Sequence, residues 1–263
     1  FTGPVTAPGW EEGDVADCLV KPITALSLHA TAPAPECVPD LDPSLTAGTV
    51  FAELLGAQGI TVVGEPTRRQ AAPNATELAA AQSAPVAAMV EQMLTDSDNT
   101  SAEMLAHLAG RALAGQASFD GGSKATSTVL KDLSLPAPGL VLVDGSGLSV
   151  LDRLTPSTAL GVLDKVTQGG NQQLWPVSSG LAVAGFDGTL AERFTTPETL
   201  AGRGDVRAKT GTLTAVSALS GQVVSKDGQL LTFVMISNGV EDVLASREAL
   251  DRAAAVLAEC GCR

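Results

Sequence analysis

The chain has 263 residues, of which 44% are hydrophobic and 17% charged, so it can fill a core and long disordered stretches are not expected. Its 29 acidic residues outnumber the 16 basic ones, and the formal net charge of −13 argues against binding to nucleic acid or to anionic lipid. No apolar run reaches the roughly eighteen residues that a membrane-spanning helix needs.

The cysteines indicate the compartment. Four of them stand near the two ends of the chain, Cys18 with Cys37 and Cys260 with Cys262. Neither histidine lies at metal-ligand spacing to a cysteine pair, so no metal is expected. An exported protein with disulfides is favoured, and a bridge from Cys18 to Cys37 would contribute about 3 kcal/mol through loop entropy. Four free thiols are the alternative, and the last two cysteines are either partners for a further segment or part of a frayed tail.

In the first half of the chain, hydrophobic patterns predict strands at 23–28 and 60–63, a loop at 30–43, and helices at 43–56, 85–94 and 100–114. Thr100 and Glu103 are expected to form a capping box, and Glu103 an ion pair with His107 on the same helix face. The four acidic residues near the start are expected to form a solvated face: Glu11, Glu12, Asp14 and Asp17.

In the second half, a strand is predicted at 140–143 and a helix at 156–166, and residues 175–204 are mostly irregular. Asp144 and Ser146 belong to an Asp-Gly-Ser-Gly-Leu segment, which indicates a structural turn and lacks the first glycine of a nucleophile elbow. Three strands at 206–214, 216–224 and 229–237, with a hairpin turn at 225–228, precede a closing helix at 243–258. This order predicts an antiparallel sheet with a helix packed on one face.

Two short motifs carry chemistry, Ser97-Asp98-Asn99 before a helix and Lys209-Thr210-Gly211-Thr212 on a strand. They are two of the three motifs of the serine penicillin-recognising enzymes. A lysine there places a cation near a substrate carboxylate and lowers the pKa of a hydroxyl partner. Gly211 leaves room for a ligand along the strand, and the Thr212 N–H can donate to an oxyanion. Ser97 could relay a proton and Asn99 could bind a substrate amide.

With these motifs, the sequence resembles the D-alanyl-D-alanine carboxypeptidase/endopeptidases, the class C low-molecular-mass penicillin-binding proteins. The resemblance extends over nearly the whole chain. It includes VDGSGLS at 143–149, RLTP at 153–156, LAVAGFDGTL at 181–190 and RAKTGTL at 207–213, as well as PGW at 8–10 and PITAL at 22–26.

The Ser-x-x-Lys motif, which supplies the acylated serine of that family, is missing. None of the six lysines has a serine three residues before it, and Thr128, before Lys131, is the only hydroxyl there. The resemblance therefore implies that the nucleophile lies upstream, on a segment that is a partner of this chain. Residues 1–45 would be the tail of an inserted domain and the return to the catalytic domain, and 46–263 the C-terminal part of the penicillin-binding domain. A homologue that has lost catalysis is the rival interpretation.

The resemblance implies an α/β fold of the α+β type, with an antiparallel sheet flanked by helices, like serine β-lactamases and penicillin-binding transpeptidases, and incomplete in this chain. It implies an exported serine D-Ala-D-Ala carboxypeptidase or endopeptidase that acts on peptidoglycan stem peptides through an acyl-enzyme, without a cofactor, and that β-lactams acylate. Ser97, Asn99 and Lys209 would be catalytic, and Thr210, Gly211 and Thr212 would bind substrate. A peptidoglycan-peptide-binding module without turnover is the alternative. A serine β-lactamase is less favoured, because no motif matches its deacylating glutamate.

Overall fold

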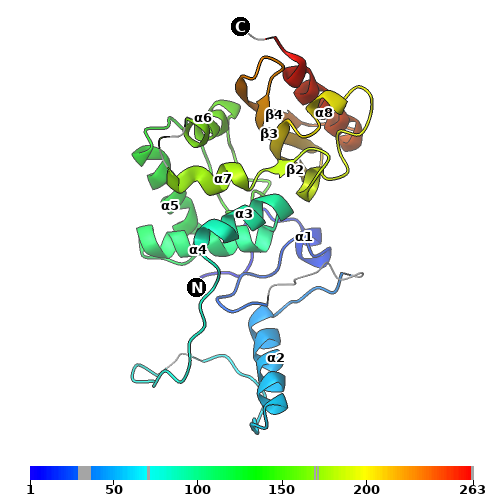
Figure 1. The fold of residues 1–263 in the computed structure, drawn as a ribbon. Helices are drawn as coiled ribbons and strands as arrows, with labels where there is room; N and C mark the ends of the chain where they lie inside the picture. Colours follow the sequence, from blue (N-terminus) through cyan, green and yellow to red (C-terminus); the bar gives the residue numbers. More distant parts are fainter. Residues whose placement is uncertain (29–36, 70–71, 169, 171, 262–263) are drawn as a thin grey trace.

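The computed structural model describes residues 1–28, 37–69, 72–168, 170 and 172–261. Its elements form a helical part and a sheet part that lie side by side (Figure 1). The α-helices are α1 (Glu12–Ala16), α2 (Pro43–Ala57), α3 (Val86–Asp96), α4 (Asn99–Ala114), α5 (Phe119–Asp132), α6 (Pro156–Thr167), α7 (Trp175–Ser179) and α8 (Val243–Glu259). Three 3-10 turns are η1 (Gln172–Leu174), η2 (Gly188–Leu190) and η3 (Leu200–Gly202).

The sheet has the order β1-β2-β3-β4, and all neighbours are antiparallel. Its strands are β1 (Ala182–Val183), β2 (Val206–Leu213), β3 (Val216–Val224) and β4 (Leu230–Asn238). The hairpin turn predicted between β3 and β4 is confirmed, since Ser225 N–H donates to Gln229 O at 2.8 Å and Gly228 adopts a φ of +75°. The predicted antiparallel sheet flanked by helices is confirmed, with strand bounds that differ by about one residue.

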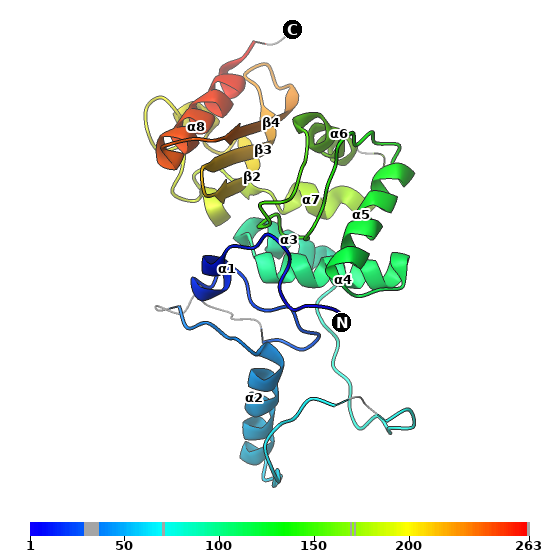
Figure 2. The ribbon, with the colours of Figure 1, turned by 180° about the vertical axis from the view of Figure 1, so that it is seen from behind.

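One face of the sheet packs against α8 and forms the main core (Figures 1 and 2). Val206, Ala208 and Leu219 from the sheet and Ala254 from α8 are fully buried in it. Small alanines on α8 allow the helix to approach the strands closely. The buried guanidinium of Arg193 pairs with the Asp251 carboxylate of α8 through two hydrogen bonds, so α8 is also tied to the segment that follows η2. On the opposite face, Thr232 Oγ1 of β4 donates to Asp164 Oδ1 of α6 at 2.6 Å.

Glycines allow a close contact between α4 and α5. A Cβ on Gly121 would lie 2.0 Å from Gln116 O, and one on Gly110 would lie 2.5 Å from the carbonyl carbon of Gly121. Helix α5, whose first turn is capped by the Ser118 hydroxyl, was not predicted as an element of its own. Its two adjacent glycines have low helix propensity, and they stand in a helix because a Cβ there would meet Gln116, just after α4, or Ala106 on α4.

Three predicted strands are wrong or much reduced. Residues 23–28 form no strand: Ile23 N–H donates to Val5 O at 2.7 Å, and its side chain packs in a small cluster with Val20 and Phe119. Residues 60–63 have no partner strand within the described chain, and 140–143 retains a single bridge, Val141 to Arg153. Each run has the hydrophobicity of a strand, but a strand needs a neighbour with which to pair its backbone.

The predicted capping box and the ion pair of Glu103 are also wrong. Asp98 caps α4 by accepting from Ser101 N–H at 3.0 Å. The buried Glu103 carboxylate instead accepts from the N–H groups of Gly145 and Ser146, at 2.9 and 2.8 Å, and burial raises its pKa. His107 Nδ1 lies 2.9 Å from the backbone oxygen of Glu103, its ring packs against Phe1 and Phe119, and burial lowers its pKa.

Asp14 does not belong to a solvated face. It is 6% exposed and accepts from Glu11 N–H at 2.7 Å in a capping box of α1, and burial raises its pKa. Glu11, Glu12 and Asp17 are exposed, as predicted.

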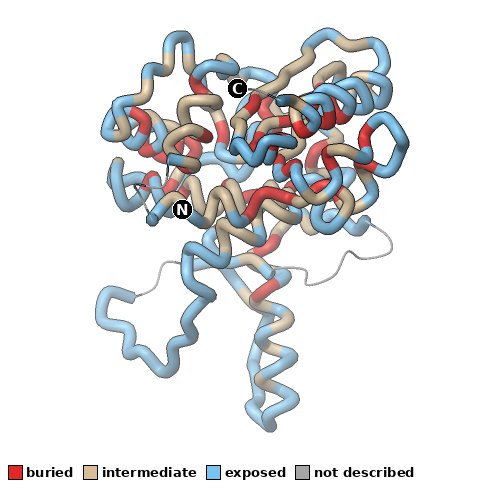
Figure 3. The backbone as a smooth tube through the Cα atoms, turned by 45° about the horizontal axis from the view of Figure 1, so that its top comes forward, coloured by how far each residue is buried: buried red, intermediate tan, exposed pale blue. Residues whose placement is uncertain are grey.

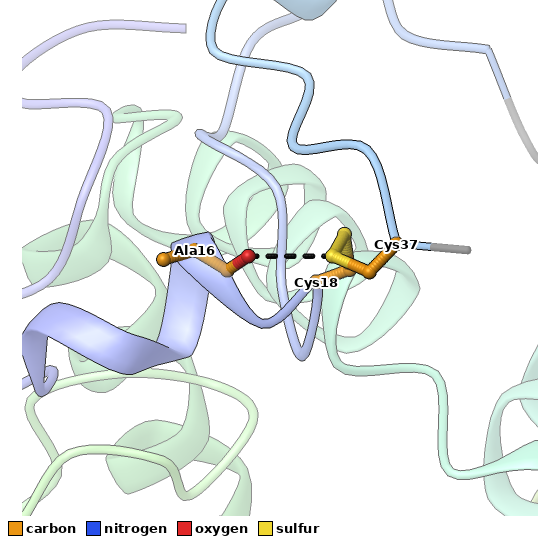
Figure 4. Close-up of a disulfide and its surroundings, with 3 residues drawn as sticks. All are labelled: Ala16, Cys18 and Cys37. Carbon is orange, nitrogen blue, oxygen red and sulfur yellow. Dashed lines mark hydrogen bonds between the residues drawn. A yellow bond between two sulfur atoms is a disulfide. The ribbon is translucent and has the colours of Figure 1, made fainter.

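The predicted disulfide between Cys18 and Cys37 is confirmed (Figure 4). It ties the end of α1 to the segment that leads into α2, and Cys37 Sγ lies 3.3 Å from Ala16 O. Cys260 is disulfide-bonded as well. Most of the predicted loop at 30–43, together with Cys262, lies outside the described residues.

Helix α2 projects away from the body of the molecule and exposes most of its length (Figure 3). Only Pro43 and Ala47 are buried on it, and Phe51 and Leu54 are more than half exposed. Within the described ranges, no helix combines the length and the hydrophobicity required to cross a bilayer.

Candidate active site

Ser97 stands at the turn between α3 and α4. It ends α3 in the left-handed conformation, with a φ of +57°, which is uncommon for a residue with a side chain. The next residue, Asp98, caps α4, so the chain reverses direction within two residues. This sharp turn brings the Ser97 hydroxyl to β2.

Lys209 reaches that hydroxyl from the sheet. Its Nζ donates to Ser97 Oγ at 2.7 Å and to the backbone oxygen of Thr210, also at 2.7 Å. Burial disfavours the charged form of the lysine and lowers its pKa to about 8. The site therefore holds an ammonium group that gives up its proton more readily than an exposed lysine does, in direct contact with a hydroxyl that can carry one.

The strand that carries Lys209 has an open edge. Strand β1 pairs only with Arg207 and Ala208, and no described strand pairs with the rest of β2 on that side. Val206 O accepts from Ala184 N–H on the β1 side. Because backbone groups alternate in direction along an antiparallel strand, the N–H groups of Thr210 and Thr212 also face this edge. An extended ligand could pair with it, as a strand does.

Gly211 lies between these two donors. A Cβ added to it would come within 3.3 Å of Ala218 Cβ on the neighbouring strand and would meet nothing closer. The glycine therefore adds no side chain to its face of the strand, which it shares with the Lys209 side chain.

Thr189 was not identified from its chemistry in the sequence. Its hydroxyl, on η2, accepts from Thr210 Oγ1 at 3.1 Å. The only signal for it was its place in the LAVAGFDGTL segment that carried the family resemblance, where nothing distinguished it from its neighbours.

Asn99 is close in sequence to Ser97 but has another partner. It is the first residue of α4, and its Nδ2 donates to Leu19 O at 2.9 Å. The next residue, Thr100, accepts from Lys21 N–H at 3.0 Å, so the N-terminal segment crosses the start of α4. The structure thus joins Ser97 to Lys209 by a hydrogen bond, whereas the side chain of Asn99 hydrogen-bonds Leu19 and neither of them.

The Asp-Gly-Ser-Gly-Leu segment forms a turn held by its own aspartate. Asp144 accepts from the N–H groups of Gly147 and Ser149 and from Trp10 Nε1, each at 2.8 Å. Asp152 accepts from Val143 N–H at 2.6 Å. Burial, followed by the neighbouring charge of Asp144, raises its pKa to about 7. These carboxylates fix the turn and the N-terminal segment, as expected of a structural turn.

The described residues contain no cluster of side chains suited to a metal ion. Thr128, the only hydroxyl three residues before a lysine, is exposed and donates to Lys124 O within α5 at 2.9 Å. That contact lies within one helix and joins Thr128 to neither Ser97 nor Lys209.

Residues 29–260 match the D-Ala-D-Ala carboxypeptidase 3 (S13) family. The chain belongs to this family. It is 37% identical to the carboxypeptidase DacB of Mycolicibacterium smegmatis, over all of this chain and 57% of that protein. It is 36% identical to a carboxypeptidase of Mycobacterium tuberculosis, over all of this chain and 56% of that protein. The S13 chain described here thus spans a little over half the length of these curated relatives.

Among solved structures, the S13 chain is similar to penicillin-binding protein 4 (dacB) of Haemophilus influenzae in complex with a β-lactam. The match has a TM-score of 0.72 and 26% identity, and it covers 82% of this chain and 51% of that one. The predicted penicillin-binding fold and the family resemblance are both confirmed.

Proposed function

We propose that this S13 chain is the C-terminal part of a serine D-Ala-D-Ala peptidase that acts on peptidoglycan stem peptides as a carboxypeptidase, an endopeptidase or both. The observation that carries the proposal is the 2.7 Å contact between Lys209 Nζ and Ser97 Oγ, beside the open edge of β2. Family membership supports the substrate class. The nucleophile would come from an upstream Ser-x-x-Lys segment, because this sequence contains none.

The reaction is an acyl transfer. The upstream serine hydroxyl loses its proton as Oγ bonds to the carbonyl carbon of the scissile D-Ala–D-Ala amide, the C–N bond breaks, and the leaving amine takes up that proton. Ser97 and Lys209 would carry that proton, and the Thr212 N–H would donate to the oxyanion. Water then releases the acyl group and regenerates the serine. A β-lactam would acylate the same serine, and no cofactor enters these steps.

Lys209, Thr210 and Gly211 would form the subsite for the ligand's carboxylate, with Asn99 beside its amide. Asn99 can bind the ligand only if its side-chain amide leaves the carbonyl of Leu19 or donates to that carbonyl and to the ligand at once. We also propose that 1–45 is the tail of an inserted region and its return, and that 46–263 is the C-terminal part of the penicillin-binding domain. The Cys18–Cys37 disulfide supports export to the cell-wall side of the membrane.

The decisive experiment is a denaturing gel of the protein after incubation with a fluorescent penicillin. We expect a covalent label only on a second polypeptide that carries Ser-x-x-Lys, or on a longer product that contains this chain. Lys209→Met should abolish the label, whereas the exposed Lys226→Met should keep it. Label on the isolated 263-residue chain would contradict the proposed origin of the nucleophile.

A binding module without turnover is the second candidate, and the missing Ser-x-x-Lys motif is the observation that favours it. A module would bind a D-Ala-terminated peptide in an equilibrium measurement, and no fluorescent penicillin would label any species that contains this chain. A labelled serine on an upstream segment would exclude it.

A further inference from the structure

A pair of hydroxyls lies at the open edge of β2, and only one of them belongs to the Lys-Thr-Gly motif. Thr210 Oγ1 donates to Thr189 Oγ1 at 3.1 Å, across 21 residues of sequence. Among the described residues, the Thr189 hydroxyl has no acceptor for its own proton. The two hydroxyls together have two protons to donate. One proton forms the hydrogen bond between them, which leaves one O–H for a ligand.

The position of Thr189 is fixed by close contacts. Gly188, which precedes it, has a φ of +50°, and a Cβ there would lie 2.3 Å from Thr95 O near the end of α3. Leu190, which follows it, is fully buried in the main core. Because α3 also ends at Ser97, the same helix end positions both the Ser97 hydroxyl and the Thr189 hydroxyl.

The charge near this pair favours an anion. Lys209 Nζ contacts the backbone oxygen of Thr210, so a cation lies against the main chain of the residue that carries one of the two hydroxyls. A hydroxyl that itself accepts a hydrogen bond is a stronger donor, because hydrogen bonds in a chain polarise one another. The pair can act in either direction: Thr189 can donate to Thr210 while Thr210 donates to the ligand, or the reverse.

We propose that Thr189 is a positioning residue that holds the Thr210 hydroxyl for the carboxylate of the substrate or of a β-lactam. This inference rests on the proposed function and adds to the motif one residue that the motif does not contain. It assigns to η2 a part in recognising the free carboxylate, which distinguishes a chain-terminal D-Ala from an amidated or esterified one.

The test compares Thr189→Val, Thr189→Ser and Thr232→Val in the protein that carries this chain together with its Ser-x-x-Lys segment. Thr232→Val is the matched control, because it also removes one side-chain hydrogen bond between elements, from Thr232 to Asp164 on the opposite face of the sheet. The probes are a penicillin with a free carboxylate and its methyl ester, and the readout is the second-order rate constant of acylation.

Thr189→Val should slow acylation by the free acid about tenfold, because a Thr210 hydroxyl that is no longer held by Thr189 bonds the charged carboxylate less well. It should change the rate for the methyl ester less than twofold. Thr189→Ser should restore the wild-type rate, and Thr232→Val should affect both probes equally. An equal loss for acid and ester in Thr189→Val, or no loss for either, would overturn the proposal.

A second measurement separates the two proposals. If the wild-type protein is acylated by neither probe, the proposed peptidase function fails, and the carboxylate site is tested on this chain alone. N-acetyl-D-alanine and its amide are then titrated while the methyl resonances of Thr189 and Thr210 are followed by NMR. Shifts with the acid only, lost in Thr189→Val, would support the site, and unchanged methyl resonances with the acid would refute it.

Discussion

Lys209 Nζ and Ser97 Oγ lie 2.7 Å apart although 112 residues separate them in the sequence. One comes from the first long strand and the other from a left-handed turn between two helices, so the contact exists only when the sheet part and the helical part are docked. The pair thus reports on the packing of the whole molecule as well as on its chemistry.

The pKa of Lys209 predicts a rise in stability at alkaline pH. Its pKa is about 8 in the folded chain and about 10.4 in the unfolded one, so between these values the unfolded state binds more protons. The free energy of unfolding should therefore increase as pH rises from 8 to 10, by about 1–3 kcal/mol. Below pH 8 both states are protonated and the slope vanishes.

Urea unfolding of the wild type, Lys209→Met and Lys226→Met across this range measures the effect. Lys226 is exposed, so its variant should keep the wild-type slope, whereas Lys209→Met should flatten it. Equal slopes in the wild type and Lys209→Met would show that the ammonium is not desolvated.

Two glycines on facing strands predict opposite outcomes for the same substitution. Gly221→Ala would put a Cβ 2.0 Å from Arg207 O and should lower the free energy of unfolding by about 1–3 kcal/mol or more. Gly211→Ala brings its Cβ to 3.3 Å from Ala218 Cβ, a tight contact that a shift of a few tenths of an ångström relieves, so it should cost much less stability than Gly221→Ala. Yet Gly211→Ala should slow penicillin acylation at least tenfold, because the methyl group occupies the space of the ligand. Thermal unfolding and acylation rates are measured on both variants. A wild-type acylation rate for Gly211→Ala would contradict the prediction.

The buried pair of Arg193 and Asp251 predicts that removing one charge destabilises the protein more than removing both. Arg193→Met leaves an unpaired buried carboxylate and should cost about 3–5 kcal/mol of stability. The double variant Arg193→Met/Asp251→Leu removes both charges and should recover most of that loss. Chemical unfolding of the single and double variants gives the coupling energy. Additive losses would mean that the two side chains do not depend on each other.

The raised pKa of Asp152 predicts that its contribution to stability falls as pH rises, opposite to the effect of Lys209. Burial and the Asp144 charge raise its folded pKa to about 7, against about 3.9 unfolded, so the folded state binds more protons between these values. Its contribution to stability is present below pH 4 and is lost as pH rises through 7. Asp152→Asn should therefore stabilise the protein at pH 8 and have little effect at pH 4, because the amide oxygen can still accept from Val143 N–H.

Exposed Asp132→Asn is the matched control and should leave the pH profile unchanged. Melting temperatures of the wild type, Asp152→Asn and Asp132→Asn at pH 4, 6 and 8 test this prediction. A stabilisation by Asp152→Asn that is the same at all three values would exclude protonation as its cause.

The parts of the fold that the sequence predicted are those with local signals. The hairpins of β2 to β4 follow from alternating hydrophobic and polar residues and a turn glycine, and helix α8 follows from helical periodicity. Each of these signals depends only on residues close together in the chain. The strand predictions at 23–28 and 60–63 are wrong because a strand needs a partner strand, and the hydrophobic pattern of one segment does not identify that partner. Glu103 was misassigned for the same reason, since its backbone partners, Gly145 and Ser146, lie more than forty residues away.

For the candidate site, Ser97 and Lys209 could be proposed from the sequence because each stands in a recognisable motif. The left-handed backbone of Ser97 and the unpaired stretch of β2 could not be predicted, because both depend on how the elements dock. Thr189 had no chemical signature of its own: a threonine in a turn is common, and only its contact with Thr210 distinguishes it from its neighbours in the LAVAGFDGTL segment.

The unpaired edge of β2 also has a consequence for self-association. Backbone donors and acceptors left open on a strand can pair with the same strand of another molecule, which is a common route to aggregation. Here the open stretch runs only from Lys209 to Leu213, and it ends where Thr214 donates to Glu11 of the N-terminal segment. A short edge with a lysine at one end and an acidic loop at the other is poorly suited to pairing with its own copy. The fold can therefore leave these main-chain groups unpaired while limiting polymerisation through them.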